Sequence, residues 1–395
     1  MIYREKCRVE TRNCNGVSLY IAWQFSETTY TIYFNDTGKA ENKMKDLPST
    51  LGYKMPAEWE RQNATWFSWI HNNSHWNENP IEMKKTLAEI IATISQFQKV
   101  FVNAADSVQE ELNHFLKNQF LYVENNVCLF NHETNDLWCR DHGPIYVRNA
   151  EGCLALVNWG FNAWGEKFPP WDLDNQIPNK IATLQGCKKF DAPMILEGGS
   201  IEVNGVGDLI TTESVLLNPN RNPQLSRSEI EKHLRDYLGV KRIFWLKRGI
   251  AGDDTDGHID DLVRFVDERT LVVASEADPN DVNFDALNEL YSDLLSILEL
   301  HNLDWTVHKL PMPKACNAKN WRLDRLPASY TNFLIINEAV IVPVFDQLES
   351  DAYALSLLGK LFPKREIVPI DSRVSVFEGG AIHCLSQQQP YGHFL

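Results

Sequence analysis

One short pattern recurs along the chain and limits what the chain can fold into. The pattern is Gly-x-Ile, and it stands at Gly143-Pro-Ile, Gly199-Ser-Ile, Gly257-His-Ile and Gly380-Ala-Ile. The first three glycines are almost evenly spaced, and the last interval is about twice as long. One match would be chance, but four at such spacing predict an internal repeat with one copy that has lost its glycine. The apolar run Thr331–Ile336 fills that gap.

Each copy contains the same order of predicted elements. The glycine opens a short strand, and a second apolar strand follows at Leu154–Asn158, Val215–Asn218 and Leu271–Ala274. Apolar residues at three- and four-residue spacing predict helices between the copies. These helices cover Pro80–Gln98, Ser226–Leu238, Asp281–Leu300 and Asp351–Leu361. The repeating unit is therefore strand, strand, helix, strand, and it recurs about five times.

The last copy begins at Gly380, only a few residues before Leu395. Residues 55–130 would have to supply what this copy lacks, which would join the two ends of the repeat. A ring of five ββαβ units around one axis meets this requirement. We therefore predict an α/β fold, a five-bladed α/β-propeller over residues 51–395. Residues 1–50 combine a short apolar patch with a long polar stretch, and they are predicted to be an N-terminal extension or one extra hairpin.

The composition excludes several classes of protein. The 12 Trp, 12 Tyr and 19 Phe are too many for a disordered chain, and no apolar run approaches the roughly 20 residues of a membrane span. With 38 Lys and Arg against 53 Asp and Glu, the net charge is -15. That charge argues against a nucleic-acid partner and suits a small cationic ligand. The eight cysteines form no CxxC pair and no signal sequence is evident, so we expect reduced thiols and a cytoplasmic protein.

Reactive side chains flank the recurring glycines, where a ring would bring them together near its axis. They are Trp138, Asp141, Glu197, His258, Asp260 and Cys384. Taken singly, each has an ordinary structural role, such as a buried thiol or a carboxylate in an exposed turn. A thiol, a histidine and three carboxylates at matched positions point instead to one reactive pocket.

This set of groups suits a planar guanidinium. Paired carboxylates bind guanidinium through fork-like, charge-assisted hydrogen bonds. A thiolate could then attack the guanidinium carbon, and a histidine among carboxylates suits proton transfer at the reacting groups. Such chemistry needs neither a metal nor an organic cofactor, so we expect none.

Five motifs, in order along the chain, resemble those of the agmatine deiminases. That family lies within the bacterial peptidyl-arginine-deiminase-type branch of the guanidine-modifying enzymes. The motifs are Trp138-Cys-Arg-Asp-His-Gly-Pro144, Leu196-Glu-Gly-Gly-Ser200, Asn218-Pro-Asn-Arg-Asn-Pro223, Gly252-Asp-Asp-Thr-Asp-Gly-His-Ile-Asp260 and Glu378-Gly-Gly-Ala-Ile-His-Cys384. Met55-Pro-Ala-Glu-Trp-Glu60 and Ala64-Thr-Trp-Phe-Ser-Trp69 match the usual start of the family, so the resemblance covers about 55–390.

The resemblance implies a function and a role for each candidate residue. The fold would be the five-bladed propeller that the repeat already predicts. The reaction would be hydrolysis of agmatine to N-carbamoylputrescine and ammonia through an amidino-cysteine intermediate, as a step in putrescine and polyamine biosynthesis. Cys384 would be the nucleophile, His258 the acid-base, and Asp141 and Asp260 the guanidinium-binding carboxylates. Glu197 and Trp138 would contact the substrate, and the resemblance is compatible with a homo-oligomer.

Two positions depart from the family pattern. The last motif has Ala381 where many agmatine deiminases have Asn or Gly, and Glu202 stands where the family often has His. Neither change removes a catalytic group, and we expect Glu202→Gln to do little. Both weaken the choice of agmatine over another guanidine.

Three other functions stay open at this point. The first is deimination of free arginine or of arginine in peptides. The second is a metal-dependent hydrolase built on the acidic cluster Asp253–Asp261, since carboxylates suit hard cations. The third is a propeller that only binds a partner, although an intact set of Cys384, His258 and Asp141 argues against a decayed enzyme.

Overall fold

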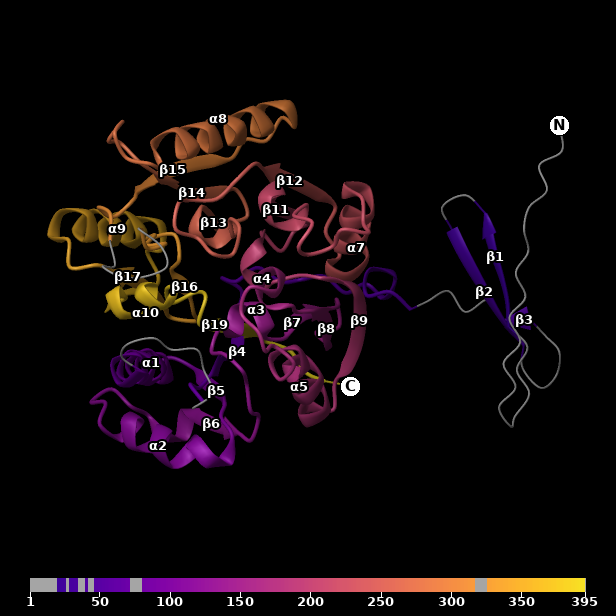
Figure 1. Ribbon diagram of the computed structural model, residues 1–395, viewed down its shortest axis with the longest axis horizontal. Helices are drawn as coiled ribbons and strands as arrows, with labels where there is room; N and C mark the ends of the chain where they lie inside the picture. The colour runs from indigo at the N-terminus through magenta and orange to yellow at the C-terminus, as the bar shows by residue number, and fades with distance from the viewer. Residues whose placement is uncertain are drawn as a thin grey trace.

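The computed structural model describes residues 20–25, 28–34, 40–41, 46–71, 80–316 and 325–394. Within residues 46–394, the described strands form five small mixed sheets in a mixed α/β fold. Figure 1 shows five helices at the periphery of this part: α1 (Pro80–Ser95), α5 (Ile177–Gln185), α7 (Arg227–Leu238), α8 (Phe284–Leu300) and α9 (Leu348–Leu361). The turn α3 (Cys139–His142), which carries Asp141, lies near its centre.

Four of the sheets share one topology, in which two antiparallel strands are followed by a third strand parallel to the second. They are β7 (Ile145–Arg148), β8 (Leu154–Gly160) and β9 (Lys188–Ile195); β10 (Ile201–Val203), β11 (Asp208–Thr212) and β12 (Arg242–Leu246); β13 (Val263–Asp267), β14 (Thr270–Ser275) and β15 (Thr306–Pro311); and β16 (Leu334–Ile335), β17 (Ala339–Val344) and β18 (Glu366–Asp371). The predicted order of strand, strand, helix, strand is confirmed in each sheet.

A helix makes each crossover to the third strand, as parallel pairing requires. These helices are α5 (Ile177–Gln185), α7 (Arg227–Leu238), α8 (Phe284–Leu300) and α9 (Leu348–Leu361). The sequence sets their ends and faces. Ser226 and Glu229 form a capping box at the start of α7, and left-handed Gly239 ends it. In α8, leucines at three- and four-residue spacing are buried against the sheet of β13–β15.

The fifth sheet joins the two ends of the repeat. Its order is β19 (Ser386–Pro390), β4 (Gln62–Ser68), β5 (Lys99–Asn103) and β6 (Val127–Phe130), with α1 (Pro80–Ser95) and α2 (Asp106–Lys117) as its crossovers. Strand β19 pairs antiparallel with β4, and Trp66 Nε1 donates a hydrogen bond to Gln389 Oε1 at 3.0 Å. The prediction that residues 55–130 complete the last copy is thus confirmed.

A short helical turn precedes the first strand in three of the sheets. These turns are α3 (Cys139–His142), η4 (Gly198–Ser200) and η5 (Ile259–Asp261). The prediction that the glycine opens a strand is wrong in two copies. Ile259 lies in η5 and β13 begins at Val263, while Gly380-Ala-Ile precedes β19, which begins only at Ser386. The predicted strand Val215–Asn218 is wrong as well. Its first two residues end α6 (Glu213–Leu216) and the other two follow that turn, because a short apolar run does not distinguish a strand from a helical turn.

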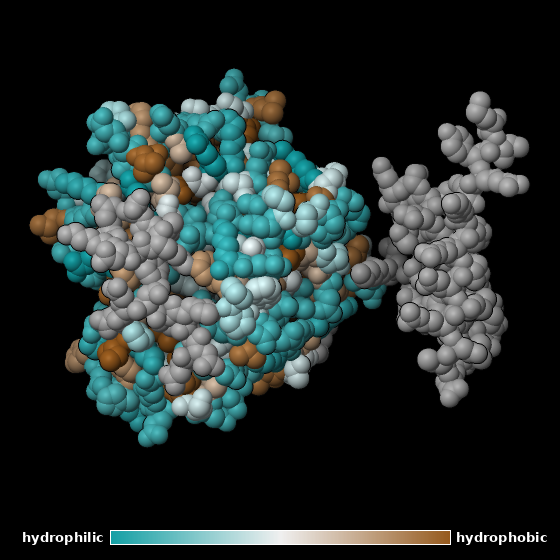
Figure 2. Space-filling model, in the orientation of Figure 1, coloured by the Kyte–Doolittle hydropathy of each residue, from teal (hydrophilic) through white to brown (hydrophobic). Residues whose placement is uncertain are grey.

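Residues 1–50 are described only in part. Strands β1 (Tyr20–Phe25), β2 (Thr28–Phe34) and β3 (Ala40–Glu41) pair as an antiparallel sheet. The rest of the predicted extension before Asp46 lies outside the described residues, so its boundary near residue 50 stays a prediction. Across the described ranges, every helix is too short or too polar to span a bilayer. The face in Figure 2 is mostly hydrophilic, with hydrophobic residues scattered over it.

Trp66 tests the closure of the fifth sheet. Its side chain is fully buried, packs against Phe101 and Phe130, and bonds to Gln389 on β19. Trp66→Ala is expected to lower the free energy of unfolding by about 3–5 kcal/mol, as for other large buried aromatic side chains. Urea denaturation measures this change. The control is Leu348→Ala, at a side chain 88% exposed, and equal small effects of both variants would contradict the closure.

Candidate active site

The turns that precede the first strands bring the candidate residues together. Asp141 lies on α3, Glu197 stands directly before η4, and His258 and Asp260 lie at the start of η5. Turn α3 contacts η4, and η4 contacts η5. The backbone N–H of Arg140 donates to the carbonyl of Cys384 at 3.2 Å, so the nucleophile candidate adjoins α3. The predicted convergence of these motifs agrees with this geometry.

A pocket of about 340 Å³ opens over these turns. Its lining combines aromatic, acidic and thiol side chains: Trp138, Asp141, Trp164, Phe168, Asp254, Thr255, Glu378, Gly379 and Cys384. Three of the six predicted site residues, Trp138, Asp141 and Cys384, line it directly. Glu197, His258 and Asp260 stand behind that lining, fully buried.

Asp141 is held by two donors from different units. Its Oδ2 accepts a hydrogen bond from Trp164 Nε1 at 2.9 Å, and its Oδ1 accepts one from the backbone N–H of Gly199 at 3.0 Å. Gly199 is needed here, because a Cβ on it would lie 2.5 Å from Nδ1 of His258. Burial raises the pKa of Asp141 to about 6. The carboxyl group therefore favours a cation beside it.

His258 lies between two carboxylates and hydrogen-bonds to neither. Its Nδ1 is 3.8 Å from Asp141 Oδ1, and its Nε2 is 3.9 Å from Glu197 Oε2. Neither ring nitrogen has a hydrogen-bond partner within the described part of the chain. Burial alone would lower its pKa, but the charges of Asp141 and Glu197 raise the pKa of His258 to about 10. The ring is thus a buried imidazolium at neutral pH.

The Asn218–Pro223 motif holds this histidine and its carboxylate in place. Arg221 is buried, and its Nε donates to Glu197 Oε1 at 2.6 Å. The same guanidinium bonds to Asp256 Oδ2 at 2.6 Å and to the carbonyl of Thr255 at 2.9 Å. Arg221 therefore ties Glu197 to the loop that leads into His258.

Cys384 is a buried thiol with one side-chain donor beside it. Asn332 Nδ2 lies 3.1 Å from its Sγ, and Asn332 Oδ1 accepts the backbone N–H groups of His383 and Cys384. Burial, with the nearby carboxylates of Asp260 and Asp261, raises the pKa of Cys384 well above its ordinary value. Without a cation in the pocket, the group is therefore a thiol and not a thiolate.

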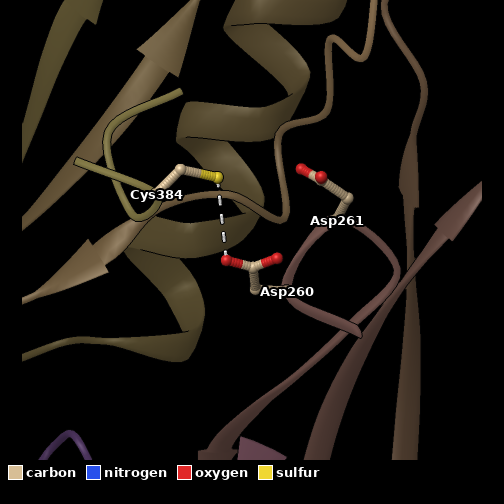
Figure 3. Close-up of side chains that lie close together, drawn as sticks. All are labelled: Asp260, Asp261 and Cys384. Atoms are coloured by element: carbon tan, nitrogen blue, oxygen red, sulfur yellow. Dashed lines mark hydrogen bonds between the residues drawn. The ribbon is translucent and has the colours of Figure 1, made fainter. Parts of the chain in front are cut away.

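Asp260 has one oxygen bound and one open. Its Oδ2 accepts from His383 Nδ1 at 2.7 Å and lies 3.8 Å from Cys384 Sγ, as Figure 3 shows for the thiol. Its Oδ1 has no partner among the described residues. Burial would raise the pKa of Asp260, but the hydrogen bond with His383 holds it below its ordinary value. The carboxylate therefore stays ionised next to the thiol.

The acidic run Asp253–Asp261 offers less to a metal than its sequence suggests. Asp253 accepts from backbone N–H groups of Thr255 and His258, and Asp256 accepts from Lys167, Asn220 and Arg221. Ligand atoms of Asp260, Asp261 and Cys384 do lie within 4.8 Å of one another (Figure 3). Asp261 Oδ1, however, already accepts from Asn332 at 3.0 Å. A metal here would compete with those donors.

Glu202 lies in a buried ion pair with Arg264, and the expectation that Glu202→Gln does little to turnover stays a prediction. Its carboxylate is buried, accepts from Arg264 Nε at 3.0 Å, and accepts from the backbone N–H of Phe265 at 2.8 Å. Burial raises the pKa of Glu202 to about 7. A strand residue next to a Gly-rich motif can face either side of its sheet, and the sequence alone did not decide which.

Several residues of the site were not predicted from the sequence. Glu58 and Arg221 lie inside motifs that were recognised, but nothing in the sequence gave either one a role. Asn332 lies in the repeat copy that has lost its glycine, and only its position in that copy could have pointed to a role in the site. Trp164 gave no signal, since it reaches Asp141 from a loop with left-handed backbone at Ala163, Trp164 and Glu166.

Comparison with known proteins agrees with this geometry. Residues 54–390 match the Porphyromonas-type peptidyl-arginine deiminase family. The chain belongs to this family. Its relatives include the agmatine deiminases of Ectopseudomonas mendocina, 35% identical over 87% of this chain and 97% of that protein, and of Medicago truncatula, 36% identical over 88% and 99%. The chain is thus an enzyme, a hydrolase of amidine C–N bonds, and the resemblance seen in the motifs is confirmed.

Solved structures of the family have the same fold. The agmatine deiminase of Enterococcus faecalis superposes with a TM-score of 0.82, at 31% identity over 88% of this chain and 98% of that one. A cysteine-to-serine variant of the C. jejuni agmatine deiminase with substrate bound superposes with a TM-score of 0.77, at 33% identity over 86% and 97%. The mixed α/β fold of the described residues is therefore that of this deiminase family.

The raised pKa of Cys384 predicts how the thiol reacts without substrate. Below the thiol pKa, the thiolate fraction grows about tenfold per pH unit, and only the thiolate is alkylated. Alkylation of Cys384 by neutral iodoacetamide is therefore expected to be slow at pH 7 and to keep accelerating up to pH 9. Mass spectrometry of the Cys384 peptide measures the rate, with Cys384→Ser to assign that peptide. A plateau near pH 7 would mean that the thiolate is already formed.

Proposed function

We propose that the enzyme hydrolyses agmatine to N-carbamoylputrescine and ammonia through a covalent amidino-cysteine intermediate. The observation that carries this proposal is one buried set of groups: a histidine ring without hydrogen-bond partners in the described residues, an open carboxylate oxygen and a thiol around one acidic pocket. Buried polar groups are normally satisfied. A guanidinium in the pocket would supply N–H donors to Asp141 and Asp260 and a carbon for the thiolate.

The incoming cation would also create the nucleophile. Carboxylates raise the pKa of Cys384 in the free enzyme, and a guanidinium between them would cancel much of that effect. The thiol would then release its proton to solvent, and the thiolate would attack the guanidinium carbon. The thiolate would form only when the guanidinium is beside it, so neither charge would be buried without a partner of opposite sign.

His258 would move the remaining protons. As an imidazolium it would donate a proton to the terminal nitrogen, the C–N bond would break, and ammonia would leave the amidino-cysteine. The now neutral ring would take a proton from water, whose oxygen attacks the same carbon. The C–S bond would break as the hydroxyl proton leaves to solvent, which gives the ureido product and the thiolate. Glu197 and Arg221 would keep the ring oriented through both steps.

The pocket mouth supports agmatine over arginine. Asp254 and Glu378 line the pocket, its walls include Trp138, Trp164 and Phe168, and the described part of its lining has no Lys or Arg. An apolar linker with a second cation at its far end suits such a mouth. The carboxylate of free arginine would face two acidic side chains, which disfavours it. The product would then serve putrescine and polyamine biosynthesis.

Other parts of the proposal rest on the fold and the cysteines. We infer that the five sheets close into a five-bladed α/β-propeller, which the shared β19–β4 sheet supports. The free cysteines of the described ranges are compatible with a cytoplasmic enzyme. A homo-oligomeric state, and the division between residues 1–50 and 51–395, stay predictions.

One assay tests the proposed function. Ureido product is measured with agmatine, free arginine and an arginyl peptide, before and after dialysis against a strong chelator. Agmatine is expected to give the highest kcat/KM, with no change after dialysis. Cys384→Ser is expected to be inactive, because a serine hydroxyl does not form the anion that a thiol does.

Each other outcome of this assay has a definite meaning. A preference for the peptide or for arginine would replace agmatine with the alternative substrate. Activity lost on dialysis and restored by zinc, manganese or calcium would favour the metal-dependent hydrolase. No ureido product from any substrate would overturn deimination altogether.

The two guanidinium-binding carboxylates give a second test. Asp141→Asn and Asp260→Asn keep the shape of the side chain and remove its charge. Each is expected to lower kcat/KM roughly 10²- to 10⁴-fold, since breaking a buried ion pair costs about 3–5 kcal/mol. Glu151→Gln, at an exposed carboxylate, is the control. Mild and equal effects of all three variants on agmatine turnover would mean that these carboxylates do not meet the substrate charge.

A further inference from the structure

His383 lies between two buried carboxyl groups and bonds to both. Its Nδ1 is 2.7 Å from Asp260 Oδ2, and its Nε2 is 2.8 Å from Glu58 Oε2. All three side chains are buried, and His383 itself is only 1% exposed. Both distances are those of hydrogen bonds, and the tautomer of the ring sets which nitrogen donates. The imidazole therefore links Glu58 and Asp260 into one chain of hydrogen bonds.

Glu58 anchors the far end of this chain. Its Oε2 also accepts from Arg264 Nη2 at 2.8 Å, and its Oε1 accepts from the backbone N–H of Ile335 at 2.7 Å. The charges of Arg264 and His383 outweigh burial and hold the pKa of Glu58 far below its ordinary value. A fixed, ionised carboxylate at Nε2 determines which way the imidazole ring faces.

The hydrogen bond between His383 and Asp260 determines the orientation of the Asp260 carboxylate. Because Oδ2 is tied to His383, the carboxyl plane is fixed and Oδ1 is left without a partner in the described residues. Oδ2 lies 3.8 Å from Cys384 Sγ. The same hydrogen bond therefore sets both the free oxygen and its distance from the thiol.

We propose that Glu58 and His383 are positioning residues, which act through Asp260 to aim one carboxylate oxygen at the substrate beside Cys384. This inference rests on the proposed deimination. Neither residue lines the pocket, so neither would touch the guanidinium. Misplacing a carboxylate that binds a planar cation would lower the rate as well as the affinity.

A competing explanation is that Glu58 only neutralises the buried Arg264. The protein contains a control for this competing explanation. Glu202 is equally buried and also bonds to Arg264, through Nε at 3.0 Å, but it does not contact His383 in the described structure. Glu58→Gln and Glu202→Gln each remove one carboxyl partner from the same guanidinium. Only the first changes the chain of hydrogen bonds that ends at Asp260.

The first experiment compares these two variants by kcat, KM and thermal unfolding. Both are expected to lower the Tm. Glu58→Gln is expected to lower kcat/KM about 10- to 100-fold, as for residues that orient a functional ligand, with a fall in kcat. Glu202→Gln is expected to stay within about threefold of the wild type, like changes away from such features. Equal kinetic losses in both variants would overturn the proposal.

A second experiment keeps the proposal testable if Glu58→Gln does not fold. In His383→Asn the amide nitrogen can take the place of Nδ1 and still donate to Asp260, whereas in His383→Gln it can replace only Nε2. We expect His383→Asn to retain at least about tenfold more kcat/KM than His383→Gln. Equal activities, or the reverse order, would overturn the proposal.

A double-mutant cycle separates positioning from general damage. If His383 acts through Asp260, replacing His383 should lower kcat/KM only slightly once the Asp260 charge has been removed. In the Asp260→Asn background, His383→Gln is therefore expected to cost less than about threefold. A full multiplicative loss would overturn the proposal.

Failure of this inference can be distinguished from failure of the proposed function. If the wild type forms ureido product and Cys384→Ser does not, deimination stands, and the comparison of Glu58→Gln with Glu202→Gln decides the inference alone. If the wild type forms no ureido product from any guanidine, both are lost.

Discussion

Charge balance around the pocket is the constraint on which the rest of the structure depends. Six carboxyl groups are buried there: Glu58, Asp141, Glu197, Glu202, Asp260 and Asp261. Three buried arginines, Arg140, Arg221 and Arg264, face them, and the imidazolium of His258 adds one more positive charge. Buried charges persist only when they are paired or hydrogen-bonded. Burial raises the pKa of Asp141, Glu202 and Asp261, and a cation beside them would favour their ionised forms.

The repeated unit explains how so many charges reach one place. A short turn before the first strand carries the functional group in several units: Asp141 on α3, Glu197 before η4, and His258 with Asp260 at η5. The sheet shared by β19 and β4 then brings both ends of the chain to the same site. Cys384 comes from one end and Glu58 from the other, and His383 connects them. The pairing of β19 with β4 therefore also brings parts of the site together.

Residues outside the repeat turns complete the pocket. Trp164 and Phe168 come from the loop after β8, and Lys167 on that loop donates to Asp256 and to the carbonyl of Asp254 at 2.6 Å. Arg221 also donates to Asp256. Asp256 thus links Arg221 to the loop after β8, and it lies in the loop that leads into His258. The walls that would select a substrate and the histidine that would move protons share their supports.

The sequence by itself determined the repeating unit and the completion of the last copy by residues 55–130, and it proposed six candidate site residues, because glycine spacing, apolar periodicity and reactive side chains are all local signals. It did not determine the strands near Val215 and Ile259, where a short buried run fits a turn as well as a strand. Nor did it give Glu58, Glu202, Asn332 or Trp164 a role. Each of these acts through a partner far away in the chain, such as Arg264, Cys384 or Asp141. Only the tertiary structure decided those pairs, because a buried charge is defined by what packs against it and not by its neighbours in sequence.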